Sequence, residues 1–339
     1  MTPLLSIFMP TFNGAPFVRE ALESVIDNGF AGFEIVVVDD ASTDDTVAVV
    51  EAIRHPALRL VRQPQNLGVG LTRQRAIGLL RGRHVALLDQ DDIAVPGRFE
   101  QQVARLETAG GPDIVGGAIE RFGDDKRLGV AAYPQSDDAI KSMLLFTSPI
   151  INPAACMKLA PFRERRIDYR PETGPGADYA LWVDGMRAGL RFENLPQVVT
   201  RYRRHAASYT ASDYGNVVSH MHSIRGEVVA HYFPAMTDAA RAALADALSG
   251  RIVSRAGWAA GASAMALAAM LAPAVPGIDV ADMLDRLEVQ LLNFIVRGLE
   301  VQATDFAALE ALTDQDDNFE QWRARDSGAL DRRIMALFG

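Results

Sequence analysis

The segment Glu34-Ile-Val-Val-Val-Asp39-Asp40 predicts the clearest β-strand of the chain. β-Branched residues pack well on a pleated sheet, and an unbroken apolar run is typical of a strand that is buried on both faces. Shorter apolar runs predict three further strands, at Leu4–Met9, Leu58–Arg62 and His84–Leu88. Two of the four predicted strands therefore lead directly into aspartates, at 39–40 and at 89–92.

Segments with helical periodicity separate these strands, and we expect helices at Pro16–Asn28, Asp44–Arg54 and Gly70–Leu80. Strands that alternate with helices of this length indicate βαβ units. The predicted fold class is α/β, with a Rossmann-like, mostly parallel central sheet flanked by helices. Ligands of such sheets bind beyond the carboxyl ends of the strands, where both acidic clusters are expected.

After residue 110 the pattern is less regular. Strands are expected at Asp113–Phe122, Ile150–Met157 and Gln197–Arg203, and a helix at Asp178–Ala188 follows a Gly- and Pro-rich loop at Pro171–Gly176. From Asn216 onward the chain reads as Ala-rich helices. We therefore expect residues 1–110 and 111–214 to be two halves of one α/β domain, with a helical C-terminal extension at 215–339.

Composition and charge exclude several classes of protein. The 339 residues are 49% hydrophobic and 23% charged, which is typical of a globular chain. The net charge of −9 argues against nucleic-acid binding through a basic surface. Only residues 111–214 carry no net negative charge, so an anionic ligand is expected there. The single cysteine, Cys156, excludes a disulfide framework and a Cys-rich zinc site, and favours a reducing, cytoplasmic compartment.

The stretch Ala256–Ile278 carries no charged residue. It is rich in Ala and Gly and is interrupted by Pro273 and Pro276, so we interpret it as a buried or amphipathic helix rather than a membrane span. Peripheral membrane attachment, which would place the protein at the inner face of the membrane, stays open. The N-terminal segment lacks a basic region and predicts a strand rather than a signal peptide.

Asp89-Gln90-Asp91 follows the apolar strand at His84–Leu88. Two carboxylates at a strand end can hold a hard divalent cation such as Mg²⁺ or Mn²⁺, together with water and phosphate oxygens. A polar turn is the alternative interpretation. Because Asp39-Asp40 ends another strand of the same predicted sheet, one cluster can hold a metal while the other accepts hydrogen bonds from a base or ribose.

These residues resemble the family 2 glycosyltransferases, which have the GT-A fold. The similar segments follow the order and spacing of that family over about residues 4–210. They are Ser6–Gly14 with Val18–Ser24, Phe33–Ser42, Asn66–Ile77, Leu87–Asp92, Ala177-Asp-Tyr-Ala-Leu-Trp182, and Arg201-Tyr-Arg-Arg-His205 with Ser208. The resemblance implies a nucleotide-sugar-binding half at 1–110 and an acceptor-binding, catalytic half at 111–214.

The resemblance also implies roles for single residues. Asp178 matches the catalytic base, and Asp91 matches the ligand of the divalent metal, Mn²⁺ or Mg²⁺. Asp40 matches the acceptor from the uracil of a UDP-sugar, and Asp89 lies near the ribose. The residues expected to bind the nucleotide are Pro10, Thr11, Asp40, Arg73 and Asp89.

A basic cluster at 201–205 is expected to contact the diphosphate. Alternate residues of a strand share a face, so Arg201 and Arg203 are expected to point together. We predict diphosphate contacts for Arg203 and His205, and a salt-bridged edge is the alternative for the arginines.

The predicted activity is metal-dependent, inverting transfer of one sugar from a nucleotide sugar, most simply a UDP-sugar, to a hydroxyl acceptor in surface polysaccharide or glycoconjugate synthesis. The Gln-x-x-Arg-Trp motif of the processive synthases is absent, which favours single transfer. The acceptor class is open between saccharide, lipid-linked and protein acceptors. Dimerisation through the C-terminal helices is a further hypothesis.

Two other functions remain as alternatives. A sugar-phosphate nucleotidyltransferase also binds a nucleotide with Mg²⁺, but the segment Thr11–Gly14 lacks the basic, Gly-rich loop of that class. A catalytically degenerate GT-A scaffold that acts as a binding or regulatory protein is the second alternative. It is favoured by Ala177, which stands where the family usually has Glu, and opposed by the four aspartates Asp40, Asp89, Asp91 and Asp178.

Overall fold

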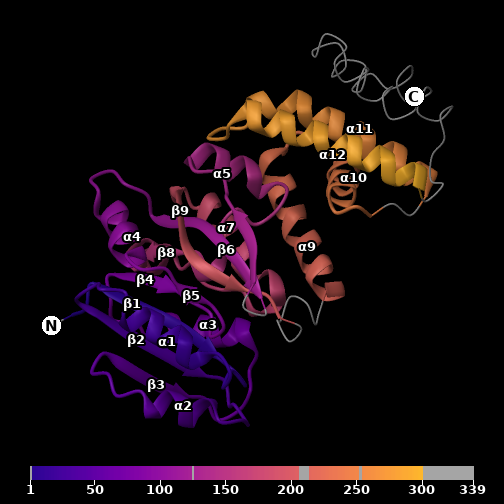
Figure 1. The fold of residues 1–339 in the computed structure, drawn as a ribbon. Helices are drawn as coiled ribbons and strands as arrows, with labels where there is room; N and C mark the ends of the chain where they lie inside the picture. The colour runs from indigo at the N-terminus through magenta and orange to yellow at the C-terminus, as the bar shows by residue number, and fades with distance from the viewer. Residues whose placement is uncertain (1, 124–125, 206–213, 252–253, 301–339) are drawn as a thin grey trace. The chain divides into compact units, whose positions relative to one another are not determined.

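The computed structural model describes residues 2–123, 126–205, 214–251 and 254–300 (Figure 1). The chain forms two compact units. The first comprises Met1–Ile140 with Ser148–His220, and the second comprises Lys141–Thr147 with Met221–Gly339. Helices α5 (Asp137–Leu144) and α9 (Tyr214–Tyr232) each begin in the first unit and end in the second.

Four parallel strands form one half of the central sheet in the first unit. They are β1 (Leu5–Thr11), β2 (Phe33–Asp39), β3 (Leu58–Arg62) and β4 (His84–Leu87), in the order β3-β2-β1-β4. Every residue of β1 is buried, because β1 lies between β2 and β4 and has both faces covered. The parallel arrangement confirms the four strands that the apolar runs predict.

The other half of the sheet is mixed. It continues through β8 (Cys156–Lys158), β6 (Ile114–Gly123), β9 (Phe192–Arg203) and β5 (Ile93–Ala94), and β7 (Lys126–Ala131) pairs with β6. Strand β8 is antiparallel to both β4 and β6, while β6 and β9 run parallel. Strand β8 is therefore the junction between the two halves.

Helices flank this sheet (Figure 1). They are α1 (Val18–Ile26), α2 (Thr46–Ala52), α3 (Val69–Ile77), α4 (Arg98–Glu107), α6 (Leu159–Arg165) and α7 (Ala177–Arg187). In α1 the buried residues are Val18, Ala21, Leu22 and Val25, which recur at the three- and four-residue spacing of one helix face. These side chains join the core that also contains Ile7 and Ile35.

The strand predicted at Ile150–Met157 is mostly wrong. Residues Asn152–Ala154 form a 3₁₀ turn, and the strand begins only at Cys156. Pro153 stands near the start of that turn and cannot donate a ladder hydrogen bond, which explains the break. The predicted loop at Pro171–Gly176 is likewise a 3₁₀ segment, η2, with a kink at Gly174. The last strand begins at Phe192, five residues before its predicted start.

The second unit contains α10 (Asp238–Leu248), α11 (Arg255–Leu271), the 3₁₀ turn η3 (Ala272–Ala274) and α12 (Val280–Glu300). Small residues let these helices approach closely. A Cβ added at Gly261 would lie 2.8 Å from the Phe294 ring and 3.0 Å from the Ala247 Cβ. Within the described residues, one helical stretch, Ala256–Ala274, has the length and composition to cross a membrane, and half of it is buried.

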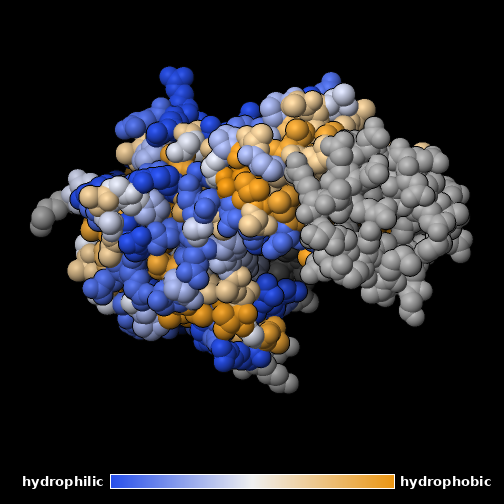
Figure 2. All heavy atoms as spheres, turned by 90° about the horizontal axis from the view of Figure 1, so that it is seen from above, coloured by the Kyte–Doolittle hydropathy of each residue, from blue (hydrophilic) through white to orange (hydrophobic). Residues whose placement is uncertain are grey.

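Figure 2 shows mostly hydrophilic residues over the surface outside its grey atoms, with hydrophobic residues in smaller patches. Scattered apolar residues are ordinary on a protein surface. In the described part of the chain, the large hydrophobic residues that are more than 40% exposed are Phe12, Leu128, Val130 and Val289.

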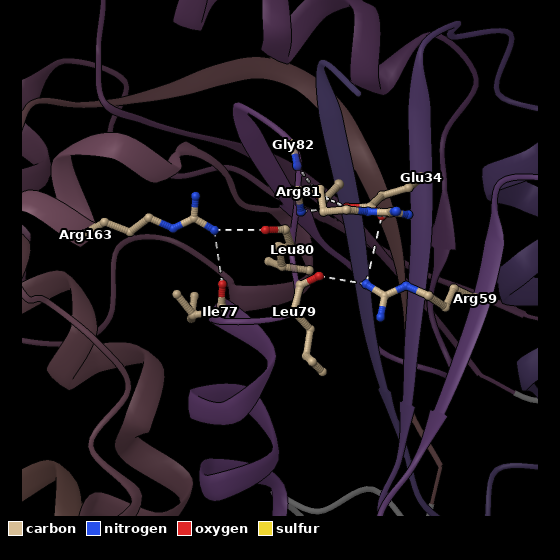
Figure 3. A network of polar contacts seen from close by, with 9 residues as sticks. Glu34, Arg59, Ile77, Leu79, Leu80, Arg81, Gly82 and Arg163 are labelled. Carbon is tan, nitrogen blue, oxygen red and sulfur yellow. Dashed lines mark hydrogen bonds and ion pairs between the residues drawn. The ribbon is translucent and has the colours of Figure 1, made fainter. Parts of the chain in front are cut away.

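A buried carboxylate organises the amino ends of the parallel strands (Figure 3). Glu34 accepts hydrogen bonds from the Ser6 hydroxyl at 2.6 Å and from the Arg81 backbone N–H and Nε at 2.7 and 2.9 Å. Arg59 and Arg163 donate to carbonyls of the connection between α3 and β4. A hollow of about 900 Å³ opens here, beside Glu34, Arg59 and Arg81. It lies at the opposite strand ends from the aspartates.

A buried guanidinium holds the junction between the two halves of the sheet. Arg98 is only 1% exposed. Its Nη2 donates to the carbonyls of Leu87 at 2.9 Å and Ala155 at 3.3 Å, and its Nη1 donates to Thr200 Oγ1 at 2.8 Å. Further bonds reach Gln102 Oε1 and the Pro153 carbonyl. Burial lowers the pKa of Arg98 to about 10, which leaves it protonated at neutral pH.

We expect Glu34→Ala to lower the free energy of unfolding by about 1–3 kcal/mol, because it leaves buried donors without an acceptor. Burial alone would raise the pKa of Glu34, but hydrogen bonds from Ser6 and Arg81 lower it overall. The stabilisation should therefore be complete at neutral pH and be lost as the pH falls below about 4. Urea unfolding at several pH values measures this. Glu51→Ala, on the exposed face of α2, is the control, and equal losses in both variants would contradict the assignment.

We expect Arg98→Met to lower the free energy of unfolding by about 3–5 kcal/mol, as when a buried charged network is broken. Urea unfolding followed by circular dichroism measures the loss. Arg105→Met on the same helix is the matched control, since its ion pair with Glu193 is exposed and such pairs stabilise weakly. A loss for Arg98→Met no larger than that of the control would show that the guanidinium does not hold the junction.

Candidate active site

Both acidic clusters lie at one edge of the sheet, as predicted. Strands β1 and β2 are parallel with Thr11 opposite Asp39, and β1 and β4 are parallel with Phe8 opposite Leu87. The carboxyl ends of β1, β2 and β4 therefore meet at this edge. The end of β9 reaches the same place, because the Arg203 backbone N–H donates to Asp92 Oδ1 at 2.8 Å.

Asp40 lies just after β2 and is buried. Its Oδ1 accepts hydrogen bonds from the Leu67 N–H and Gln63 Nε2, both at 2.8 Å, and its Oδ2 accepts from the Gly68 N–H at 2.9 Å. The carboxylate thus fixes the loop that leads into α3. Its predicted contact with a base stays a prediction, and it would be made in addition to these three internal bonds.

Pro10 and Thr11 are the last two residues of β1, and both are buried. The Thr11 hydroxyl donates to Gln90 Oε1 at 2.5 Å. Asn13, two residues later, has a φ of 48°, in the left-handed region that Asn tolerates. The chain turns sharply there, so the segment after Thr11 faces the loop that follows β2.

Arg73, Asp89 and Asp178 form one electrostatic cluster. Arg73 Nη2 lies 3.0 Å from Asp89 Oδ1, and its guanidinium lies 5.9 Å from the centre of the Tyr169 ring. Despite burial, the negative charges of Asp89 and Asp178 raise the pKa of Arg73 overall. Arg73 is therefore cationic, paired with Asp89 and within electrostatic range of Asp178, which comes from a different part of the chain.

Asp178 occupies the first turn of α7, directly after η2. Its Oδ1 accepts a hydrogen bond from the Tyr179 N–H at 2.8 Å. Gly176 stands at the N-cap position of this helix, so Asp178 is not its N-cap residue. Burial raises the pKa of Asp178, and the nearby positive charge of Arg73 opposes that rise. A carboxylate with a raised pKa is a stronger base than an exposed one.

Asp91 and His205 are in direct contact. His205 Nε2 lies 2.8 Å from Asp91 Oδ2, and the Phe17 ring packs on the imidazole with 4.7 Å between ring centres. Burial raises the pKa of Asp91, and the charge of Asp89 raises it further. The structure thus brings together the residues predicted for the metal and for the diphosphate. Ser208, which completes the motif, lies outside the described residues.

Arg203 is engaged with its own chain. Its Nε donates to the Asp91 carbonyl at 2.9 Å, and its Nη2 lies 2.5 Å from Glu20 Oε2. The guanidinium also lies 5.2 Å from the Phe17 ring centre and 4.4 Å from that of Phe122. These contacts position the turn that carries Asp91, and the predicted diphosphate contact of Arg203 would have to compete with Glu20.

Arg201 shares a side of β9 with Arg203, as predicted, because both guanidinium groups lie 4.4 Å from the Phe122 ring centre. Arg201 Nε pairs with Glu120 Oε2 at 3.0 Å. That contact agrees with the salt-bridged edge proposed as the alternative for this residue.

The residues present fit a hard divalent cation that takes most of its ligands from a substrate. Asp91 supplies carboxylate oxygens beside His205, and the buried Oδ2 of Asp92 has no hydrogen-bond partner. No group of three or more His, Cys, Asp or Glu that could hold a metal is found within the described ranges. Mg²⁺-like ions commonly use one or two carboxylates and complete their shell with water and phosphate oxygens.

Several site residues escaped the sequence analysis. Glu20 and Phe17 lie at and before the start of α1 and meet Arg203 only in the fold. Tyr169 packs beside Arg73 from a segment 96 residues away in the sequence. Gln90 stands between Asp89 and Asp91, and this position in the motif is the one feature of the sequence that points to it.

The family model "Glycosyl transferase family 2" matches residues 6–164. A glycosyltransferase of Haemophilus influenzae is 31% identical over 199 residues, which cover 55% of this chain and 70% of that protein. The Escherichia coli protein WfaP, named a UDP-Glc:alpha-D-GlcNAc-diphosphoundecaprenol beta-1,3-glucosyltransferase, is 24% identical over 224 residues, which cover 63% of this chain and 83% of WfaP.

Two solved structures share the fold. TarS 1-349 of S. aureus, in complex with UDP-GlcNAc, has a TM-score of 0.57 and 18% identity, covering 95% of this chain and 92% of that one. The mannosyltransferase PcManGT of Pyrobaculum calidifontis, in complex with GDP-Man and Mn²⁺, has a TM-score of 0.51 and 20% identity, covering 93% and 87%. The α/β fold with its C-terminal helices is therefore GT-A. Together, these matches show that the chain belongs to glycosyltransferase family 2 and is a glycosyltransferase.

Proposed function

We propose that this glycosyltransferase moves a single sugar from a UDP-sugar to a hydroxyl acceptor, with inversion and with a divalent metal, in the synthesis of a surface polysaccharide or glycoconjugate. The observation that carries the proposal is the cluster of Arg73, Asp89 and Asp178, beside the contact between Asp91 and His205. These residues would supply a base in Asp178, two further acidic groups in Asp89 and Asp91, and two nitrogen donors in Arg73 and His205.

Asp178 is proposed as the general base. In an inverting transfer, the acceptor hydroxyl attacks the anomeric carbon on the side opposite the leaving diphosphate, and a carboxylate takes the hydroxyl proton. Burial strengthens Asp178 as a base by raising its pKa. The positive charge of Arg73 opposes that rise and so favours the ionised carboxylate. Ala177 precedes it and is buried, so the neighbouring position supplies no second acid.

The donor diphosphate is proposed to lie against Asp91, His205 and Arg203. A divalent ion bound there would neutralise the charge that grows on the leaving phosphate. Asp91 supplies the carboxylate for that ion, and His205 orients the carboxylate through the 2.8 Å contact. Arg73 holds Asp89, which is proposed to accept from the ribose.

The comparisons support this donor class without fixing the sugar. WfaP is named for UDP-Glc, TarS was solved with UDP-GlcNAc, and PcManGT was solved with GDP-Man and Mn²⁺. The name of WfaP gives a lipid diphosphate as its acceptor, which supports a lipid-linked saccharide here. We propose action in the cytoplasm, since a single cysteine, Cys156, offers no disulfide framework and fits a reducing compartment.

Asp178→Asn is expected to lower the turnover number by at least about 10²-fold, because the amide cannot take the hydroxyl proton. Melting temperature and UDP affinity should stay at the wild-type values. In the wild type, turnover should fall as the pH drops through the raised pKa of Asp178. Asp27→Asn, at an exposed position after α1, is the matched control. Near wild-type turnover in Asp178→Asn would overturn its role.

Adding Mn²⁺ should accelerate release of nucleotide from a UDP-sugar, and EDTA should abolish that release. In a panel of UDP-, dTDP- and GDP-sugars, UDP-sugars should give the fastest release. Asp91→Asn should weaken UDP binding in Mn²⁺ by about tenfold or more and leave binding in EDTA unchanged, because the carboxylate contributes through the ion. Release that is equally fast in EDTA would contradict the metal dependence. Faster release from a dTDP- or GDP-sugar would contradict the assignment of a UDP-sugar as the donor.

A further inference from the structure

Gln90 stands between the two aspartates of the motif, in a turn closed by a hydrogen bond of 3.2 Å from the Asp92 N–H to the Asp89 carbonyl. Its neighbours Asp89 and Asp91 contact Arg73 and His205. The Gln90 side chain makes different contacts, with the last residue of β1 and with the segment that follows β1.

The Gln90 amide pairs with the Phe12 peptide group as a neighbouring strand would. Gln90 Oε1 accepts from the Phe12 N–H at 3.0 Å, and Gln90 Nε2 donates to the Phe12 carbonyl at 3.1 Å. The Thr11 hydroxyl also donates to Oε1, at 2.5 Å. A primary amide supplies a donor and an acceptor together, which a carboxylate or an apolar side chain cannot do.

Gly14 leaves the space that this contact needs. A Cβ added at Gly14 would lie 2.0 Å from Gln90 Oε1 and 2.4 Å from its Cδ. The three atoms nearest to that Cβ all belong to Gln90, and the φ of Gly14 is outside the left-handed region, so an alanine could adopt this backbone conformation but would collide with the Gln90 amide. Residues 14 and 90, which are 76 positions apart, are thus matched to each other.

The segment held by Gln90 is also bonded to the loop after β2. The Asn13 N–H donates to Ser42 Oγ at 2.9 Å, and the Gly14 N–H donates to Thr46 Oγ1 at 2.8 Å. Residues 11–15, which we name the first loop, and residues 41–46 therefore form one hydrogen-bonded unit. The Gln90 side chain joins this unit to the acidic turn through its bonds with Thr11 and Phe12.

We infer that Gln90 is a positioning residue that couples the acidic turn at 89–92 to the first loop, which begins at Thr11, a residue expected to bind the nucleotide. The inference rests on the proposed use of a nucleotide donor. Through its paired bonds with Phe12 and the bond from Thr11, Gln90 holds the acidic turn in register with the first loop, so that one nucleotide diphosphate contacts both.

The first test measures UDP affinity by calorimetry, with Mn²⁺ and with EDTA. Gln90→Ala should reduce the gain in affinity that Mn²⁺ gives by about tenfold, the effect of losing one or two net hydrogen bonds. Gly14→Ala should have the same effect by displacing Gln90. Adding Gly14→Ala to Gln90→Ala should cause no further loss, because the collision partner is gone. Gln101→Ala, at an exposed position on α4, should match the wild type.

The second test needs no ligand. Hydrogen exchange of the free protein should be faster in a peptide covering residues 12–15 of Gln90→Ala and of Gly14→Ala than in the wild type or Gln101→Ala, with unchanged exchange in β2. Unchanged exchange in the first loop would overturn the positioning role. If exchange in the first loop is faster but Mn²⁺ raises UDP affinity as much as in the wild type, the proposed coupling between the first loop and the acidic turn is overturned. A wild type that binds no UDP in Mn²⁺ would refute the proposed donor, while the exchange result would still decide the role of Gln90.

Discussion

The buried Arg98 guanidinium is the constraint on which the rest of the first unit depends. A cation this deep must give each N–H a partner, and its acceptors come from the end of β4, the segment before β8, and β9. Strands β4 and β8 pair where the parallel half of the sheet joins the mixed half, and β9 lies beyond β6 in the mixed half. Because Leu87 lies two residues before Asp89, where the acidic turn begins, the group that secures this junction also helps to position that turn.

The acidic turn carries electrostatic strain that the surrounding chain only partly relieves. Burial and mutual repulsion raise the pKa of Asp91, and they raise that of Asp92 well above its ordinary value. His205, Arg73 and the Arg203 backbone N–H offset part of that cost. Carboxylates held together in this way favour the arrival of a cation, which is the physical basis of the proposed metal dependence.

The sequence predicted the parallel strands because each is a short apolar run, and such a run is a local feature that can be recognised without knowing its partners. It predicted Asp40, Asp89 and Asp91 at one edge because parallel strands end together. It failed at 150–157, where Pro153 breaks an apolar run. It could not find Arg98, since arginine is a mostly exposed residue type and nothing local marks this one as buried. The Arg203–Glu20 pair joins residues 183 positions apart, and no local pattern reports such a contact.

The sequence by itself determined at which strand ends the aspartates stand, and these are the residues to which we propose to assign the chemistry, because strand periodicity and aspartate position are local properties. Only the tertiary structure decided what each side chain does there. It placed Asp178 beside Arg73, paired Arg203 with Glu20, and turned Gln90 away from its neighbouring aspartates toward Phe12. The physical reason is that hydrogen bonds and charge interactions act over a few ångströms. Their partners are therefore set by how the strands and loops pack, not by their order in the chain.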